Sequence, residues 1–381
     1  MILAIEQYKK VLTIYPKFGM VTGNYGMTLQ YYADLMFDQT HKTLLHEAAI
    51  LMLNNAINAT DLGTYDEAKQ NFKKYLELYA EDSIARALTT SIPLNEPKYD
   101  DKEELKYRNW VLDKSLFLNP LGDLPYQHIA FATDILQLPD ILVKLGSKPV
   151  FHGLLNQLKQ EFIFARYQYY CGLQDSEKTH FADKDTFLLQ FEDYPQYSIR
   201  IEQIKSAFKT LYSLLDKIAF FINAYFDLGI KDQDVSFFNI WKSEKPGRGG
   251  YKFKTTLRPD DNYGIGALYW IGKDFHESFL DSPNPQARRI KDIRNALEHR
   301  YSKIYWDSFD GRASGEVDDL AIYISEGELI DETMRLLRLI REAIISLVIA
   351  VRIEEDNRKT EAGDQPVVGI TLLPFDDEWK R

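Results

Sequence analysis

The feature that most constrains the fold is a run of apolar residues at helical spacing near the end of the chain. Residues 330–353 place apolar side chains at positions i, i+3 and i+4, which forms an apolar face on an α-helix. A second long helix is predicted over residues 199–228. Because apolar helix faces are stable only when they pack together, we predict an all-α protein with a helical bundle in its second half.

Proline positions and polarity divide the chain into four predicted regions. Residues 1–88 are predicted to form helical hairpins. Residues 89–149 are predicted to form an ordered connecting strap, because prolines interrupt a segment that is too apolar for a free linker. Residues 150–357 form the helical domain and residues 358–381 a polar tail. Shorter elements are expected within these regions: helices over 110–118, 151–171, 268–279 and 286–305, and strands over 321–324 and 367–373.

The first 80 or so residues resemble tetratricopeptide repeats. Ala4, Tyr8, Val11 and Pro16 have the small, aromatic, small and proline spacing of that repeat's second helix. The dipeptide Tyr25-Gly26 then falls where the repeat's first helix carries Leu-Gly. The alternative is a helical hairpin domain of a more general kind. Because the chain begins inside a predicted second helix, we expect further repeats upstream in the natural gene.

Composition excludes several classes of function. The net charge of −11 argues against a general affinity for duplex nucleic acid, although it leaves room for a small basic cleft. Cys171 is the only cysteine, so an internal disulfide and a cysteine-based metal site are both excluded. The sequence shows no signal peptide and no apolar run long enough to span a membrane. We therefore predict a cytoplasmic protein without a metal, a cofactor or a membrane partner.

The residues best suited to catalysis lie in the predicted helix 286–305. Arg294 can hold a phosphate with two parallel hydrogen bonds, and His299 can move a proton near neutral pH. On a straight helix, five steps place these two side chains about 140° apart, whereas Asn295 and His299 share a face. Because the arginine side chain is long, the spacing permits the two groups to converge without requiring it.

This motif and its helical context resemble the HEPN superfamily. The nuclease motif of that superfamily is an arginine followed, four to six residues later, by a histidine, often with a polar residue directly after the arginine. Arg294, Asn295 and His299 match those positions, and a long helix precedes and follows them. The resemblance implies a four- to five-helix bundle. Repeats at the N-terminus joined to such a domain resemble one bacterial branch of the superfamily.

The resemblance also implies an activity, namely RNA cleavage without metal by a dimer. The 2′-hydroxyl attacks the adjacent phosphorus and leaves a 2′,3′-cyclic phosphate and a 5′-hydroxyl. In that chemistry His299 acts as general base or acid, and Arg294 neutralises charge in the transition state. Asn295 orients the phosphate or His299, and Asp216 is a candidate supporting acid. The expected setting is a toxin or an antiviral effector that the repeats regulate, with an antitoxin or another protein as a possible partner.

Basic residues near the motif are candidate contacts for the RNA. Arg288, Arg289 and Lys291 precede the motif on the same helix. Arg248 and Lys252 lie in a glycine-containing loop within residues 231–258, where cations alternate with aromatic residues, a pattern that suits a single strand. The alternative is a flexible surface loop.

Simpler interpretations of the motif stay open. Arg294 is spaced to pair with Glu298 across one helical turn, and His299 is equally compatible with a plain surface position. The whole domain then serves as a non-catalytic RNA-binding or dimerisation module on a protein-interaction scaffold. Cleavage of RNA in the presence of EDTA distinguishes these alternatives from the enzyme.

Overall fold

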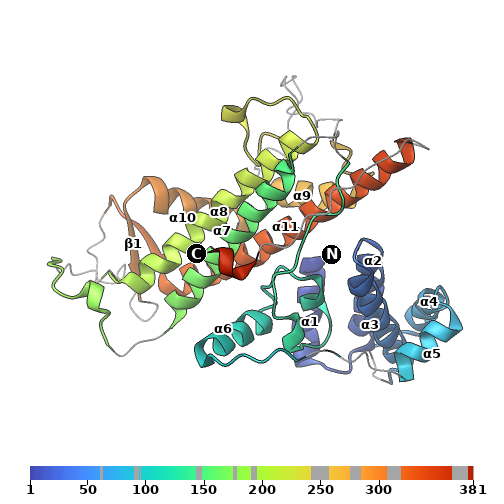
Figure 1. Ribbon diagram of the computed structural model, residues 1–381. Coiled ribbons are helices and arrows are strands. Elements are labelled where there is room, and N and C mark those ends of the chain that lie inside the picture. Colours follow the sequence, from blue (N-terminus) through green and yellow to red (C-terminus); the bar gives the residue numbers. More distant parts are fainter. Residues whose placement is uncertain are drawn as a thin grey trace.

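The protein is mostly helical, as the sequence predicts. A computed structural model describes residues 1–60, 63–89, 94, 96–142, 148–174, 178–189, 195–241, 257–274, 285–306, 319–362 and 376–380. Helical hairpins form the N-terminal part, and a helical bundle forms the C-terminal part (Figure 1). The predicted strand 367–373 and the candidate RNA contacts Arg248 and Lys252 lie outside the described residues.

The N-terminal part consists of five helices. They are α1 (Ile2–Ile14), α2 (Gly19–Asp34), α3 (Gln39–Ile57), α4 (Asp66–Leu76) and α5 (Glu81–Thr89). Glycine allows α2 to approach its neighbours closely: a Cβ on Gly23 would lie 2.3 Å from the ring of Phe72 on α4. The hairpins are thus confirmed, while their assignment as tetratricopeptide repeats stays a prediction. We call α1–α5 the arm.

In its described residues, the strap contains one α-helix and two short 3₁₀ turns. They are α6 (Lys102–Asp113), η1 (Pro120–Asp123) and η2 (Ile129–Phe131). The prediction of a helix over 110–118 was wrong, because the helix begins eight residues earlier and ends five residues earlier. Asp101 starts it by accepting a hydrogen bond from the backbone N–H of Glu103 at 2.8 Å. Ser115 ends it by adopting a positive φ of 54°.

Five helices form the C-terminal bundle: α7 (Val150–Leu173), α8 (Ile199–Tyr225), α9 (Tyr263–Asp274), α10 (Pro285–His299) and α11 (Glu326–Ala362). The side chain of Ser198 caps α8, and that of Asn262 caps α9. As a result α9 begins five residues before the predicted helix 268–279. Helices α7, α8 and α11 lie side by side, with α10 at the end of the bundle farthest from α2–α5 (Figure 1).

Two short parallel strands close the end of the bundle next to α10. They are β1 (Ser302–Tyr305) and β2 (Ile322–Ser325), paired from Ser302 with Ile322 to Tyr305 with Ser325. The strand predicted over 321–324 is confirmed with a shift of one residue. The predicted helix 286–305 was too long, because α10 ends at His299 and the chain turns into β1. This turn places His299 at a free helix end.

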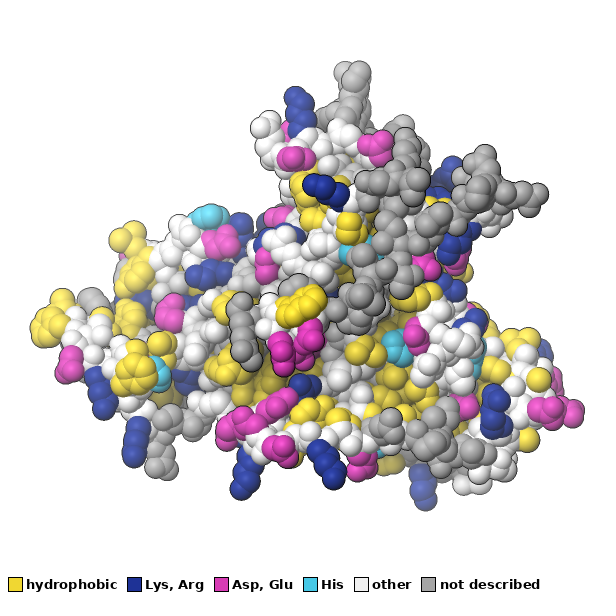
Figure 2. Space-filling view, viewed as in Figure 1, with side chains coloured by type: hydrophobic (Ala, Val, Ile, Leu, Met, Phe, Trp, Pro, Cys, Tyr) yellow, Lys and Arg dark blue, Asp and Glu magenta, His cyan; other side chains and the backbone are white. Residues whose placement is uncertain are grey.

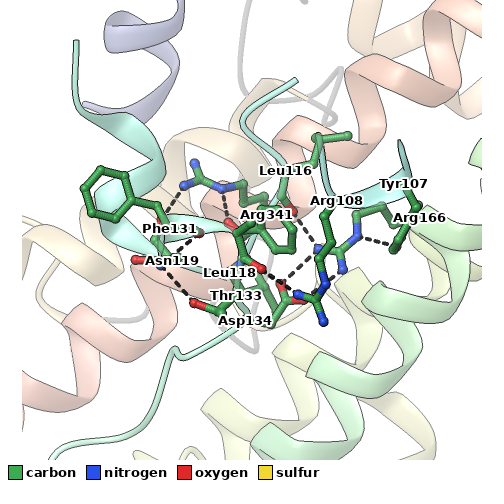
Figure 3. Close-up of polar contacts among 12 residues, drawn as sticks. Tyr107, Arg108, Leu116, Leu118, Asn119, Phe131, Thr133, Asp134, Arg166 and Arg341 are labelled. Carbon is green, nitrogen blue, oxygen red and sulfur yellow. Dashed lines mark hydrogen bonds and ion pairs between the residues drawn. The ribbon is translucent and has the colours of Figure 1, made fainter. Parts of the chain in front are cut away.

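Two buried arginines fasten the strap to the bundle (Figure 3). Arg166 of α7 binds both carboxylate oxygens of Asp134 at 2.9 and 2.8 Å, and also the carbonyl of Leu116. Arg341 of α11 binds the carboxylate of Asp123 and the carbonyls of Phe117 and Asn119. Bidentate arginine–carboxylate pairs of this kind fix geometry strongly. These contacts hold strap residues between 116 and 134 against α7 and α11.

The arm contacts α11 of the bundle through α1 and through the end of α2, where the carbonyl of Asp34 accepts a hydrogen bond from Arg352 at 2.8 Å. Glu6 on α1 forms an ion pair with Arg338 on α11, with 2.7 Å between the nitrogen and the oxygen. Lys9, one turn later on α1, donates to the carbonyl of Gly122 in the strap at 2.8 Å. Burial lowers the pKa of Lys9 to about 8, with Asp123 acting in the opposite direction. Arm, strap and bundle therefore meet along one stretch of α11.

Candidate active site

Helix α10 presents one apolar and one polar face. Ile290, Ile293 and Ala296 recur every three residues and are buried against the bundle. Arg294 and Asn295, between Ile293 and Ala296, and Glu298 and His299, after Ala296, carry the cation, amide, carboxylate and imidazole of the candidate site. Packing of the apolar face thus determines that the polar face of α10 lies at the surface, next to α8.

The side chains of Arg294, Asn295 and His299 come together on that polar face. The Nη1 of Arg294 donates to the Oδ1 of Asn295 at 3.1 Å and lies 3.3 Å from the Nε2 of His299. The arginine side chain bridges the angle that a straight helix puts between positions 294 and 299. His299 is 63% exposed, because the helix ends there. The imidazole is therefore open to a ligand, and the guanidinium beside it is 29% exposed.

An aromatic ring of α8 supports the guanidinium. The Cζ of Arg294 lies 5.3 Å from the centroid of the Tyr212 ring, within the range of a cation–π contact. Burial raises the pKa of Tyr212 to about 12, although the nearby Arg294 acts in the opposite direction. The ring is therefore a neutral phenol at physiological pH. It holds the guanidinium in place without forming an ion pair that would neutralise it.

Glu298 is the carboxylate closest to the cation. Its Oε2 lies 2.8 Å from the Nη2 of Arg294 and 3.7 Å from the Nε2 of His299. The ion pair between Arg294 and Glu298 across one helical turn, which the simpler interpretation of the motif expects, is therefore present. It coexists with the cluster of Arg294, Asn295 and His299, because the guanidinium uses different nitrogens for the two.

Comparison with known protein families identifies the family of the C-terminal region. A model of the LA2681-like HEPN family matches residues 142–354, which include α7–α10, both strands and α11 as far as residue 354. The chain belongs to this HEPN family. No curated protein and no solved structure matches it. The cluster on α10 lies inside the HEPN domain, and α1–α6 lie outside the matched residues.

The other candidate residues of the HEPN domain differ in their surroundings. Arg289 forms a bidentate ion pair with Glu328 at the start of α11, at 2.5 and 2.6 Å. Arg288 is exposed and Lys291 is half-buried on the same helix. These three basic residues lie on the helix that carries the motif, and Arg289 has a partner within the chain. Their role in binding RNA stays a prediction.

Two residues of α8, Asp216 and Lys217, have structural partners. Asp216, a candidate supporting acid, accepts a hydrogen bond from the backbone N–H of Phe237 at 2.9 Å. Lys217 pairs with Glu161 on α7. Tyr212, which sequence reasoning missed, lies one helical turn before Asp216. The only indication in the sequence that Tyr212 belongs to the site is its position one turn before Asp216. By itself, an aromatic residue on an apolar helix is ordinarily a core residue.

Among the described residues, the face that Figure 2 shows carries no broad basic patch. Lys and Arg side chains alternate with Asp and Glu over the face that Figure 2 shows. Within the described part of the chain, no three His, Cys, Asp or Glu residues are grouped as a metal site. In the same ranges, no helix is both long and apolar enough to cross a membrane.

Proposed function

We propose that this HEPN protein is a metal-independent endoribonuclease. In the proposed reaction a 2′-hydroxyl of RNA attacks the adjacent phosphorus, the bond to the 5′-oxygen breaks, and the products are a 2′,3′-cyclic phosphate and a 5′-hydroxyl. HEPN domains are often ribonucleases. The observation that supports the proposal best is the 3.3 Å distance between the guanidinium of Arg294 and the imidazole of His299. A cation and a proton carrier at one accessible spot are the groups that this reaction needs.

Each side chain has a defined role in the proposal. His299 takes the proton from the 2′-hydroxyl or gives one to the 5′-oxygen, because an imidazole can do both near neutral pH. Arg294 stabilises the charge that develops on the phosphorane oxygens, and the Tyr212 ring keeps it in place. Asn295 holds the Nη1 edge of the guanidinium by its amide oxygen. Because the nucleophile is the 2′-hydroxyl, the substrate is RNA and not DNA.

The proposed enzyme is a homodimer. The reaction uses one group to remove a proton and another to donate one, and each chain supplies a single His299 next to Arg294. A second copy related by a two-fold axis adds the second pair. The free position of His299 at the end of α10 supports this proposal, because two such ends can face one groove.

We further propose that the arm regulates the nuclease, in the manner of a toxin or an antiviral defence effector. The hairpins α2–α5 lie far from α10 (Figure 1), so regulation has to pass through the bundle. Two contacts support such a route: Glu6 of α1 with Arg338, and Asp123 of the strap with Arg341, both on α11. A protein partner or antitoxin that binds the arm would thus act on α11, which packs against α8 and α10.

Cleavage of mixed RNA in EDTA tests the proposed activity. We expect the wild-type protein to cleave, and Arg294→Ala and His299→Ala each to lose activity by a factor of about 100 or more, as for other groups that stabilise charge or move protons. His152→Ala on α7 and Arg335→Ala on α11 are matched controls that should keep full activity. Equal cleavage by the wild type and His299→Ala would contradict the proposal. RNA binding without any cleavage would favour the non-catalytic alternative.

A further inference from the structure

We infer that Glu298 occupies the phosphate site of Arg294 in the resting protein, so that RNA binds by displacing a carboxylate of the chain itself. Glu298 then sets the affinity of the site for RNA and holds the cation in a neutralised state until RNA arrives. The inference rests on the proposed function, because it assigns the Arg294 guanidinium to an RNA phosphate. It concerns a residue that lies between the cation and the proton carrier without being either.

The contacts of the guanidinium leave a phosphate few other places to bind. Its Nη1 faces Asn295 and His299, and its Nη2 faces Glu298 at 2.8 Å. Its Nε is buried and has no hydrogen-bond partner among the described residues. The Tyr212 ring lies against the guanidinium. A phosphate needs two parallel N–H donors from one edge, and the accessible edge that includes Nη2 is the one that Glu298 already occupies.

The position of the carboxylate makes it a competitor for an anion. Its Oε2 lies within 4 Å of both Arg294 and His299, and a phosphate bridging the same two groups would occupy the same space. Two anions cannot share that space without strong repulsion. Binding of RNA therefore requires the Glu298 side chain to rotate away into solvent, which its position on the polar face of α10 allows.

The ion pair between Arg294 and Glu298 is weak enough for RNA to displace the carboxylate reversibly. The Arg294 and Glu298 side chains are 29% and 26% exposed, so water and salt screen their attraction in part. Exposed pairs at this spacing contribute at most about a factor of five to an equilibrium. A polyanion with several contacts can overcome such a barrier, whereas a single phosphate ion gains less from the exchange. The geometry thus favours RNA over free phosphate.

Binding of an uncleavable RNA tests the inference without depending on catalysis. The probe is a 2′-O-methyl oligonucleotide, which lacks the attacking hydroxyl, and the protein is the full chain with native His299. We expect Glu298→Gln to bind the probe about fivefold more tightly than wild type at low salt. The salt dependence of its binding constant should steepen by up to about 0.7 in slope, the value for one newly available phosphate contact on a single strand.

A matched control separates the inference from a general charge effect. Glu104 forms the same kind of pair with Arg108 across one turn of α6, at 2.7 Å, on a helix outside the residues matched to the HEPN family. Glu104→Gln removes the same charge and should leave probe binding within twofold of wild type. Equal gains in both variants would show a general charge effect, and unchanged or weaker binding of Glu298→Gln would show no competition; either result would overturn the inference.

Cleavage data then separate a failure of the inference from a failure of the proposed function. If the wild type cleaves RNA but Glu298→Gln binds no more tightly, the inference fails alone. If no variant cleaves RNA but Glu298→Gln still binds more tightly, the proposed function fails and the competition by Glu298 stands. Reduced cleavage by Glu298→Gln with unchanged binding would assign Glu298 to the chemical step instead, and would also overturn the inference.

Discussion

Replacement of Arg341 by methionine should destabilise the protein more than any surface substitution on α11. The Arg341 side chain is 3% exposed and binds three partners in the strap. It donates to the Asp123 carboxylate at 2.9 and 3.0 Å and to the carbonyls of Phe117 and Asn119 at 2.7 and 2.9 Å. Methionine fills much of the same volume but donates to none of these groups.

The expected magnitude follows from the groups that lose a partner. Asp123 is as deeply buried as the arginine, so the substitution leaves a buried carboxylate without its cation, at a cost of about 3–5 kcal/mol. Two buried carbonyls lose a charged donor as well, each at about 1–3 kcal/mol, although the three effects are not additive. We therefore expect the free energy of unfolding to fall by about 4 kcal/mol or more.

Urea unfolding, monitored by tryptophan fluorescence, measures this loss of stability. The matched control is Arg335→Met, six residues earlier on α11, where the arginine is 40% exposed and pairs with the 11% exposed Glu332. We expect it to cost about 1–2 kcal/mol, because Glu332 loses one donor but keeps the charge of Arg289 nearby. Arg341→Lys keeps the charge without the bidentate geometry and should lie between the two. Losses of the same size in Arg341→Met and Arg335→Met would refute the conclusion that Arg341 fastens the strap.

Three further predictions concern pH, the site and packing. Burial raises the pKa of Glu342 to about 7 from an ordinary 4.5, so folding favours its protonated form. The free energy of unfolding should therefore fall by up to about 3 kcal/mol as pH rises from 4.5 to 7, and Glu342→Gln should flatten that profile in denaturation series. Tyr212→Leu should lower the rate of RNA cleavage about tenfold by removing the ring under the guanidinium, whereas Tyr212→Phe should retain most of it. Gly264→Ala should lower the free energy of unfolding by about 1–3 kcal/mol, because its Cβ would lie 2.3 Å from the backbone nitrogen of Ala350 on α11.

The periodicity of apolar residues in the sequence predicted most of the helices. The helices of the bundle and the hairpins of the arm follow from apolar spacing. Their ends do not, because a cap is a local contact: Asp101 starts α6 earlier and Asn262 starts α9 earlier than apolar spacing predicts. The turn after His299 was missed for another reason. Pairing of β1 with β2, nearly 20 residues away, competes with continued helix at that point, and no local pattern shows that competition.

The candidate site was predictable as a motif but not as an arrangement. The identities of Arg294 and His299 suggested the chemistry, and their spacing left convergence open. Tyr212 comes from a different helix, and only tertiary packing places its ring against the guanidinium. The pairing of Arg289 with Glu328 is likewise a contact between α10 and α11, and sequence reasoning treated that arginine as available to RNA.

The most direct test of the central claim is the chemical identity of the RNA ends formed in EDTA. A purified wild-type protein and its His299→Ala variant are incubated with a defined oligoribonucleotide, and the products are analysed by mass spectrometry. The claim that Arg294 and His299 form a metal-independent nuclease site predicts 2′,3′-cyclic phosphate and 5′-hydroxyl ends with the wild type and uncut RNA with the variant. Cleavage that needs a divalent metal, leaves 5′-phosphate ends or persists in His299→Ala would contradict it.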